Sequence, residues 1–338
     1  MSAPEFVLKT TPPRIARTAV QRPPLEQVAA DTLDRTAVTV VAPAGFGKTT
    51  LLAQWRRAWL KRNALVAWLT VDPRDDPARF TLGVLHAMRA ASSNAVFDVL
   101  LSQYADGSEH HLEALTGLLR EIVRLGRETI LVIDDAERLP KSTATESLQY
   151  LLRNAPQNFH VAIGSRVPLP LHMWELATKG NLASLEAREL RLELSESIAI
   201  LGSRFGQRLS VDDCARLHDI VDGWPLGLQL AAATIEREPD LAAAIDALSA
   251  RHGDIERYFF ELLLTRVPAK TVDVLVRVAI LGHFNADLCQ AVTGCTAAKS
   301  YLAMLMVETP ILAQTGLEDW VRLHPFNIGE KVKIIVEH

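Results

Sequence analysis

The sequence has few of the features that mark secreted or membrane-spanning proteins. Its 338 residues include three cysteines, Cys214, Cys289 and Cys295, which are too few and too scattered for a disulfide framework. Cys289 and Cys295 lack the spacing of a metal knuckle, so we expect buried thiols. No apolar run reaches the ~18 residues of a membrane helix, and Met1 to Val20 lacks a signal-peptide core. We therefore expect a soluble cytoplasmic protein with no membrane partner.

The charges are equally unremarkable in their distribution. There are 36 Lys and Arg against 40 Asp and Glu, a net charge of −4, and no basic block stands out. A protein that coats nucleic acid normally presents a basic patch, so that role is not favoured. No low-complexity segment or fixed-period repeat is evident. The length predicts two or three domains, and 49% hydrophobic residues are enough for their cores.

The most informative motif is a glycine-containing turn between an apolar strand, ending at Val41, and a helix. The turn reads Ala42-Pro43-Ala44-Gly45-Phe46-Gly47-Lys48-Thr49-Thr50. Gly45 and Gly47 allow a tight turn that points backbone N–H groups inward, and the helix N-terminus adds further donors. Lys48 would hold the β- and γ-phosphates, and the Thr49 hydroxyl would ligate Mg²⁺. Ala42 stands where a first glycine is most common, so the phosphate-loop pattern is one small residue short of its strict form.

Apolar runs without strict alternation, typical of strands buried on both faces, alternate with helical segments in the first half of the chain. The strands are expected at 37–41, 65–69, 129–133 and 160–163, and the helices at 25–33, 49–61, 77–92, 108–125 and 142–154. The proline-rich start is expected to run extended as far as Leu25. This alternation predicts an α/β fold with a parallel sheet.

The periodicity becomes helical throughout after about Leu194. Helices are expected at 195–205, 211–221, 225–236 and 241–250, followed by a mostly helical stretch to Gln314 and strand-like segments at 320–324 and 331–336. The predicted domains are an N-terminal segment (1–34), a phosphate-loop NTPase domain (35–193) and a helical domain (194–250). A last region (251–338) is predicted to be a partial winged-helix-like domain only by the family resemblance given below.

Carboxylates follow the third predicted strand at the edge of the sheet where the phosphate loop also lies. Asp134 is expected to hold Mg²⁺, and Asp135 or Glu137 could orient the attacking water. Arg166, after the fourth strand, could sense or neutralise the γ-phosphate. Lys48, Asp134, Asp135 and Arg166 are therefore the candidate catalytic residues.

Together these motifs resemble the STAND-class signalling ATPases of the MalT type, the large ATP-binding LuxR-family transcriptional regulators. The resemblance covers about residues 8–326. It depends on the phosphate loop, Asp134-Asp135 and Ser165-Arg166, and on further stretches that are Thr11 to Arg14, Val66 to Asp72, Asp75 to Pro77 with Phe80, Asp222 to Leu228 and Phe284 to Cys289.

The resemblance implies an ATP/ADP-binding switch with slow Mg²⁺-dependent hydrolysis and possible ATP-dependent self-association. By the same resemblance Pro225 packs on the nucleotide base, Arg14 and Arg22 line the nucleotide, and His324 touches the β-phosphate of ADP. MalT-type regulators continue into inducer-binding repeats and a DNA-binding helix-turn-helix that these residues do not include, so no direct DNA binding is expected here. A phosphotransferase or motor-type ATPase, and a non-hydrolysing nucleotide-dependent interaction module, are the alternatives.

Overall fold

The computed structural model describes residues 3–15, 20, 22–92, 95–104, 110–236, 238–249, 269–278, 281, 284–308, 312–314 and 319–323. The chain divides into two compact units, and each is described by itself. The first unit consists of Met1–Ala42 and Lys48–Leu190, and the second of Pro43–Gly47 and Arg191–His338. Five residues of the phosphate loop, Pro43–Gly47, are thus grouped with the second unit, whereas Ala42 and the residues from Lys48 onward belong to the first.

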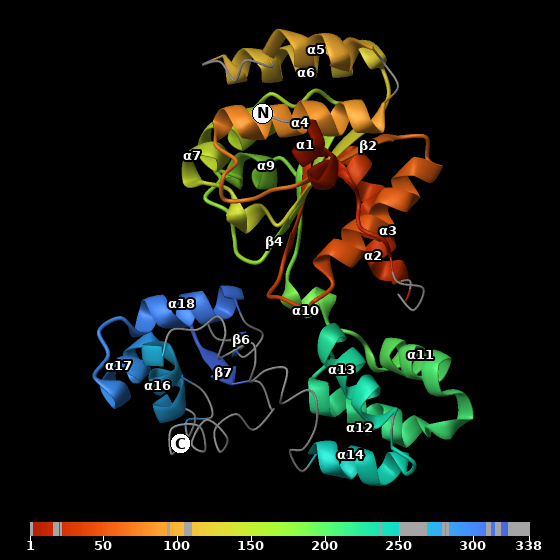
Figure 1. The fold of residues 1–338 in the computed structure, drawn as a ribbon, viewed down its shortest axis with the longest axis vertical. Helices are drawn as coiled ribbons and strands as arrows, with labels where there is room; N and C mark the ends of the chain where they lie inside the picture. The colour runs from red at the N-terminus through yellow and green to blue at the C-terminus, as the bar shows by residue number, and fades with distance from the viewer. Residues whose placement is uncertain are drawn as a thin grey trace. The chain divides into compact units, whose positions relative to one another are not determined.

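A five-stranded parallel sheet forms the centre of the first unit (Figure 1). Its strands are β1 (Ala37–Val41), β2 (Leu65–Thr70), β3 (Thr129–Asp134), β4 (Phe159–Ser165) and β5 (Leu182–Leu185). They lie in the order β2-β3-β4-β1-β5, and every neighbouring pair is parallel. Because β4 separates β1 from β3, the strand that precedes the phosphate loop and the strand that ends in Asp134 are not neighbours.

Helices connect and cover the strands. In chain order they are α1 (Ala3–Thr10), α2 (Pro23–Asp31), η1 (Thr32–Asp34), α3 (Lys48–Lys61), α4 (Pro77–Ala91), α5 (Val96–Tyr104), α6 (His111–Leu125), η2 (Ala136–Arg138), α7 (Lys141–Thr143), η3 (Ala144–Leu148), α8 (Gln149–Arg153), α9 (Trp174–Thr178) and α10 (Ala187–Leu190). The segments α7, η3 and α8 run on from one another, with a π-helical turn at η3.

Both faces of the sheet are buried, as its apolar strands require. Alternate residues such as Leu131 and Ile133 belong to one large core with the helices α4 to α6. Their neighbours Ile130 and Val132 are also fully buried, as are Leu52 and the two tryptophans of α3. α3 packs on β2 and β4, and α2 packs on α3.

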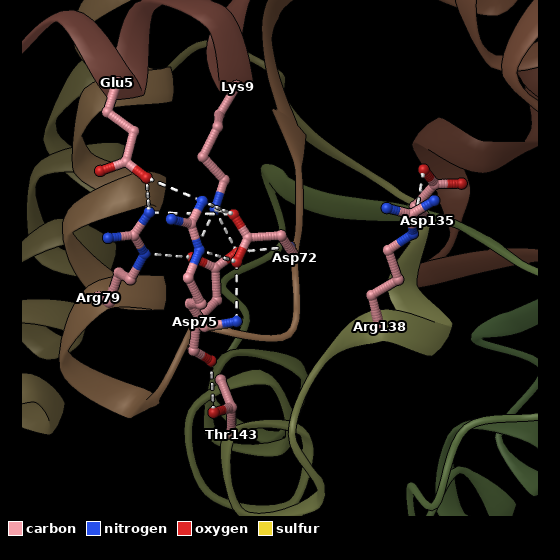
Figure 2. A network of polar contacts seen from close by, with 9 residues as sticks. Glu5, Lys9, Asp72, Asp75, Arg79, Asp135, Arg138 and Thr143 are labelled. Atoms are coloured by element: carbon pink, nitrogen blue, oxygen red, sulfur yellow. Dashed lines mark hydrogen bonds and ion pairs between the residues drawn. The ribbon is translucent and has the colours of Figure 1, made fainter.

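The N-terminal helix α1 packs on β2 and α4 and is held there by a partly buried group of ion pairs (Figure 2). Lys9 contacts the carboxylates of Asp72 and Asp75, and Arg79 contacts Asp75 and Glu5. The backbone carbonyl of Asp75 also accepts a hydrogen bond from the Thr143 hydroxyl at 2.7 Å. Burial alone would raise the pKa of Asp72, but hydrogen bonds from Arg74 and Lys9 together outweigh it and hold that pKa well below its usual range. The ion-paired side chains are called the α1 ion-pair cluster, and they are Glu5, Lys9, Asp72, Arg74, Asp75 and Arg79.

The described part of the second unit consists mainly of helices and includes a short two-stranded sheet. Its elements are α11 (Leu194–Phe205), η4 (Gly206–Arg208), α12 (Val211–Val221), α13 (Pro225–Ile235), α14 (Leu241–Ser249), α16 (Ala269–Val278), α17 (Ala286–Thr293), α18 (Ala298–Glu308), β6 (Leu312–Gln314) and β7 (Val321–Leu323). The strands β6 and β7 pair antiparallel. Cys214 and Cys289 are buried free thiols as expected, whereas Cys295 is only half-buried.

The predicted strands and helices are largely confirmed, with several omissions. Residues 3–10 form the helix α1, so the prediction of an extended start is wrong there; burial of Phe6 and the α1 ion-pair cluster stabilise a helix too short to form alone. The short helices α5, α9 and α10 and the edge strand β5 were also not predicted. The predicted strand at 331–336 lies outside the described residues. None of the helices that the structure describes has the length and apolar character that a membrane crossing needs.

Candidate functional site

The phosphate loop has the backbone that its sequence predicts. Gly45 and Gly47 both have φ of +79°, a conformation that favours glycine, and α3 begins at Lys48 immediately after the loop. The Lys48 ammonium group donates to the carbonyl of Ala42 at 2.6 Å. Lys48 is only 7% exposed, and this burial lowers its pKa to about 8 although the negative charge of Glu137 opposes the shift. A buried ammonium group at the start of a helix is suited to binding phosphate.

Thr49 and Asp134 meet across the edge of the sheet. The Thr49 hydroxyl donates to the Asp134 carboxylate, and its Oγ1 lies 3.1 and 3.0 Å from the two carboxylate oxygens. Burial, together with the charge of Asp135, raises the pKa of Asp134 to about 6. The two residues come from α3 and β3, and they bring a hydroxyl and a carboxylate together beside Lys48.

Gly164 makes this meeting possible, because β4 lies between β1 and β3. A Cβ atom at Gly164 would lie 2.8 Å from Leu52 Cδ1 and 3.1 Å from Asp134 Oδ1. The first distance is too short for any real Cβ, so a side chain here would push the Leu52 side chain aside and would press on the Asp134 carboxylate. Gly164 is therefore a part of the site that sequence analysis missed.

Glu137 and Arg166 form a second pair at the same edge. Arg166 Nε lies 3.0 Å from Glu137 Oε1, and the Arg166 backbone N–H donates to Oε2 at 3.1 Å. The Glu137 side chain is 7% exposed. Asp135, by contrast, has a left-handed backbone with φ of +58°, and its carboxylate lies 3.6 Å from exposed Arg138 (Figure 2). Of the four predicted catalytic residues, Lys48 begins the helix α3. Asp134 and Asp135 lie at and just after the end of β3, and Arg166 directly follows β4.

These donors fit Mg²⁺ and a nucleoside triphosphate. Mg²⁺ prefers oxygen ligands and usually binds through one or two protein groups together with substrate phosphates and water. Thr49 and Asp134 supply a hydroxyl and a carboxylate, and Lys48 supplies the positive charge for phosphate oxygens. In the described part of the chain, no group of three or more His, Cys, Asp and Glu side chains could hold a metal without such a substrate.

Within the second unit, the phosphate loop contacts the start of α13. The Leu226 backbone N–H donates to the carbonyl of Gly45 at 3.1 Å, and a Cβ at Gly45 would lie 2.7 Å from Trp224 Nε1. Pro225 is the first residue of α13 and is half-buried. At Gly223, φ is +66° and a Cβ would lie 2.7 Å from the Leu192 carbonyl. The Gly-Trp-Pro motif thus forms a tight helix start against the loop.

The remaining predicted site residues are less closely grouped. Arg22 donates to the carbonyls of Leu190 and Glu189, at 2.9 and 3.4 Å, so its guanidinium is engaged with α10. Arg14 is exposed, as is Thr50 of the loop. His324 lies outside the described residues. The roles of Arg14, Arg22, Pro225 and His324 toward a nucleotide remain predictions.

Two known protein families match separate parts of the chain. Residues 21–163 match the AAA ATPase domain family, and residues 260–327 match the MalT winged helix domain family. The second match includes α16, α17, α18 and the β6–β7 hairpin.

Curated relatives align with most of this chain. Serine/threonine-protein kinase PknK of Mycobacterium tuberculosis is 27% identical over 294 residues, which are 86% of this chain and 26% of the relative. The HTH-type transcriptional regulator MalT of Vibrio cholerae is 26% identical over 325 residues, 94% of this chain and 35% of the relative. The chain thus spans about a quarter to a third of the length of these relatives.

Two solved structures share the fold. The Walker-type ATPase PABY2304 of Pyrococcus abyssi has a TM-score of 0.58 at 14% identity, covering 95% of this chain and 98% of that protein. The STAND protein PH0952 of Pyrococcus horikoshii, which has a tetratricopeptide repeat sensor, has a TM-score of 0.51 at 16% identity, covering 96% of this chain and 44% of that protein.

Proposed function

We propose, from the homology of this chain to MalT regulators and to PknK over most of its length, that it is an ATP/ADP-binding regulatory switch. In this proposal it hydrolyses ATP slowly with Mg²⁺. The ATP form self-associates, and the ADP form is the resting state. The transcription-regulating activity of the MalT relatives would be the output of such a switch.

Each residue of the site has a role in this proposal. Lys48 and the loop N–H groups bind the β- and γ-phosphates, while Thr49 and Asp134 hold Mg²⁺. Mg²⁺ bound there neutralises charge on the phosphate oxygens. Asp135 or Glu137 orients the attacking water, and Arg166 senses the γ-phosphate. The loop residues that contribute are Ala42, Pro43, Ala44, Gly45, Phe46, Gly47 and Thr50.

Other residues are proposed to surround the nucleotide. Pro225 presents a rigid apolar face to the base and has no N–H that would need a partner. Arg14 and Arg22 line the nucleotide, and His324 binds the β-phosphate of ADP. For ATP to shift nearly all molecules to one form, it must bind that form better by about 5 kcal/mol, because equal affinity shifts nothing.

The observation that carries the proposal is the contact of the Thr49 hydroxyl with both oxygens of Asp134, at 3.1 and 3.0 Å. These residues are 85 positions apart, and they are brought together beside a buried lysine and a left-handed glycine loop. Hydroxyl, carboxylate and ammonium groups in this arrangement support binding of a Mg²⁺-nucleotide.

The test compares Lys48→Ala with Lys61→Ala, an exposed lysine at the end of the same helix. At 100 times its Kd, a nucleotide stabilises the folded protein by about 2.7 kcal/mol. We expect Mg-ATP and ADP to raise the melting temperature of wild type and of Lys61→Ala but not of Lys48→Ala. Equal stabilisation of all three proteins would contradict the proposal.

Single-turnover hydrolysis separates this function from its alternatives. A slow release of phosphate from bound ATP supports the switch. Binding without any hydrolysis would indicate an interaction module instead. Fast steady-state turnover that depends on a second substrate would indicate a phosphotransferase.

A further inference from the structure

The two carboxylate oxygens of Glu137 have different environments. Oε2 accepts a hydrogen bond from the backbone N–H of Arg166 at 3.1 Å. Oε1 lies 3.0 Å from Arg166 Nε as an ion pair, but this buried oxygen accepts no hydrogen bond from the residues that the structure describes. Buried carboxylate oxygens normally accept a hydrogen bond, so Oε1 can still accept one from a further donor.

We propose that Glu137 and Arg166 are an exchange pair: Arg166 neutralises Glu137 until a γ-phosphate draws the guanidinium away, and Oε1 then accepts a hydrogen bond from the attacking water. This inference rests on the proposed function and specifies how the site is regulated. It also assigns the water-orienting role to Glu137 rather than to Asp135.

The competition depends on charge. A carboxylate carries one negative charge, whereas the terminal phosphate of ATP carries more and offers three oxygens in a geometry that suits a guanidinium. Arg166 therefore favours the phosphate once it is bound. Glu137 stays in position without the guanidinium, because the Arg166 backbone N–H still holds Oε2 and the adjacent Ala136 is fully buried.

The released carboxylate then performs general base catalysis. A proton passes from the water to Glu137 Oε1 as the water oxygen bonds to the γ-phosphorus. The bond from that phosphorus to the β,γ-bridging oxygen breaks, which yields ADP and inorganic phosphate, and Glu137 passes the proton on to the phosphate or to solvent. When the phosphate leaves, Arg166 returns to Glu137.

Two further observations favour Glu137 over Asp135. Among the charges around Lys48, that of Glu137 has the largest effect in favour of the ammonium form, whereas the effect of Asp135 is smaller. Asp135 is paired with Arg138, which is half exposed and follows in the same turn. The Asp135–Arg138 ion pair therefore does not depend on whether a γ-phosphate is bound.

The test is the ratio of ATP affinity to ADP affinity, measured with Mg²⁺ by calorimetry. Glu137→Gln keeps an oxygen for the Arg166 N–H but loses the charge that restrains the guanidinium. We expect the ratio to rise about tenfold, the effect of ~1.4 kcal/mol, and single-turnover hydrolysis to fall by about 100-fold or more. Glu128→Gln is the control. Glu128 is also a carboxylate with a close partner, His160, but the two lie at the starts of β3 and β4, at the opposite end of these strands from Glu137 and Arg166.

The effect must also require Arg166. In an Arg166→Gln background, Glu137→Gln is expected to leave the ratio unchanged. An unchanged ratio in the single variant, or an equal rise in both backgrounds, would overturn the exchange. If Glu137→Gln does not fold, Glu137→Ala carries the same expectation, because it also removes the restraining charge.

The outcome also distinguishes this inference from the proposed function. Wild type that binds neither ATP nor ADP would overturn both. Wild type that binds both, with loss of binding in Lys48→Ala but no response of the ratio to Glu137, would overturn the exchange alone.

Discussion

Replacing Lys9 with methionine tests whether the α1 ion-pair cluster holds the N-terminal helix in place. The Lys9 side chain is 10% exposed and its partner Asp75 is 2% exposed. Removing one member of a buried ion pair costs about 3–5 kcal/mol, because a charge is left buried without a partner. Asp75 keeps Arg79 Nε at 3.0 Å and the Asp72 N–H at 2.8 Å. The expected loss is therefore at the lower limit, about 3 kcal/mol.

Release of α1 sets an upper limit to that loss. If α1 detaches, Asp75 regains water, and the protein loses only the contacts of the helix, chiefly the burial of Phe6. That burial contributes about 1.5–3 kcal/mol. Lys9→Met should therefore promote local opening of α1 before the sheet unfolds.

Hydrogen exchange followed by mass spectrometry measures this opening segment by segment, which matters because a chain with two units need not unfold in one step. A loss of about 3 kcal/mol corresponds to roughly 150-fold faster exchange of the α1 amides. The control is Arg74→Met, in the same cluster but 72% exposed, where a surface pair contributes about 0–1 kcal/mol. Equal effects of the two substitutions, or no effect of Lys9→Met, would refute the reasoning.

Three further predictions concern the phosphate edge. Asp134→Asn should leave ADP binding without Mg²⁺ intact and remove Mg²⁺-dependent hydrolysis; an undiminished rate would exclude its metal role. Gly164→Ala should cost about 1–3 kcal/mol and weaken Mg-ATP binding, because its Cβ meets Leu52 and Asp134, whereas Gly202→Ala, with open space around it, serves as the control in thermal melts. The pKa of Lys48 is lowered from 10.5 to about 8, so the ammonium form is disfavoured in the folded protein: its burial penalty is fully present below pH 8 and disappears as pH rises toward 10.5. ADP affinity should consequently fall above pH 8, by at most about tenfold per pH unit, with proton uptake seen by calorimetry in two buffers; constant affinity to pH 9.5 would refute this.

Local sequence patterns predicted most of the elements and one part of the site. Val38 to Thr49 contains its own strand, turn and helix signals, and the structure has the expected tight turn there, with Gly45 and Gly47 both at a positive φ. Pro225 likewise marks the first turn of α13, where its missing N–H costs nothing.

Features that depend on strand order or on distant partners were not predicted. No local pattern says that β4 separates β1 from β3, so the requirement for glycine at 164 was invisible. Glu137 was named as a candidate, but its pairing with Arg166, 29 positions away, depends on two loops meeting in space. The helix α1 was missed because its stability comes from Phe6 and from charges on other elements.

Gly164 also has a consequence for how such proteins evolve. The residues that define a nucleotide-binding motif can all be retained while one added methyl group on the intervening strand crowds the carboxylate that they depend on. Paralogues that keep the lysine, the threonine and both aspartates could thus lose the metal through a position that no motif includes. Such a protein would read as an active ATPase in its sequence and would behave as a passive scaffold.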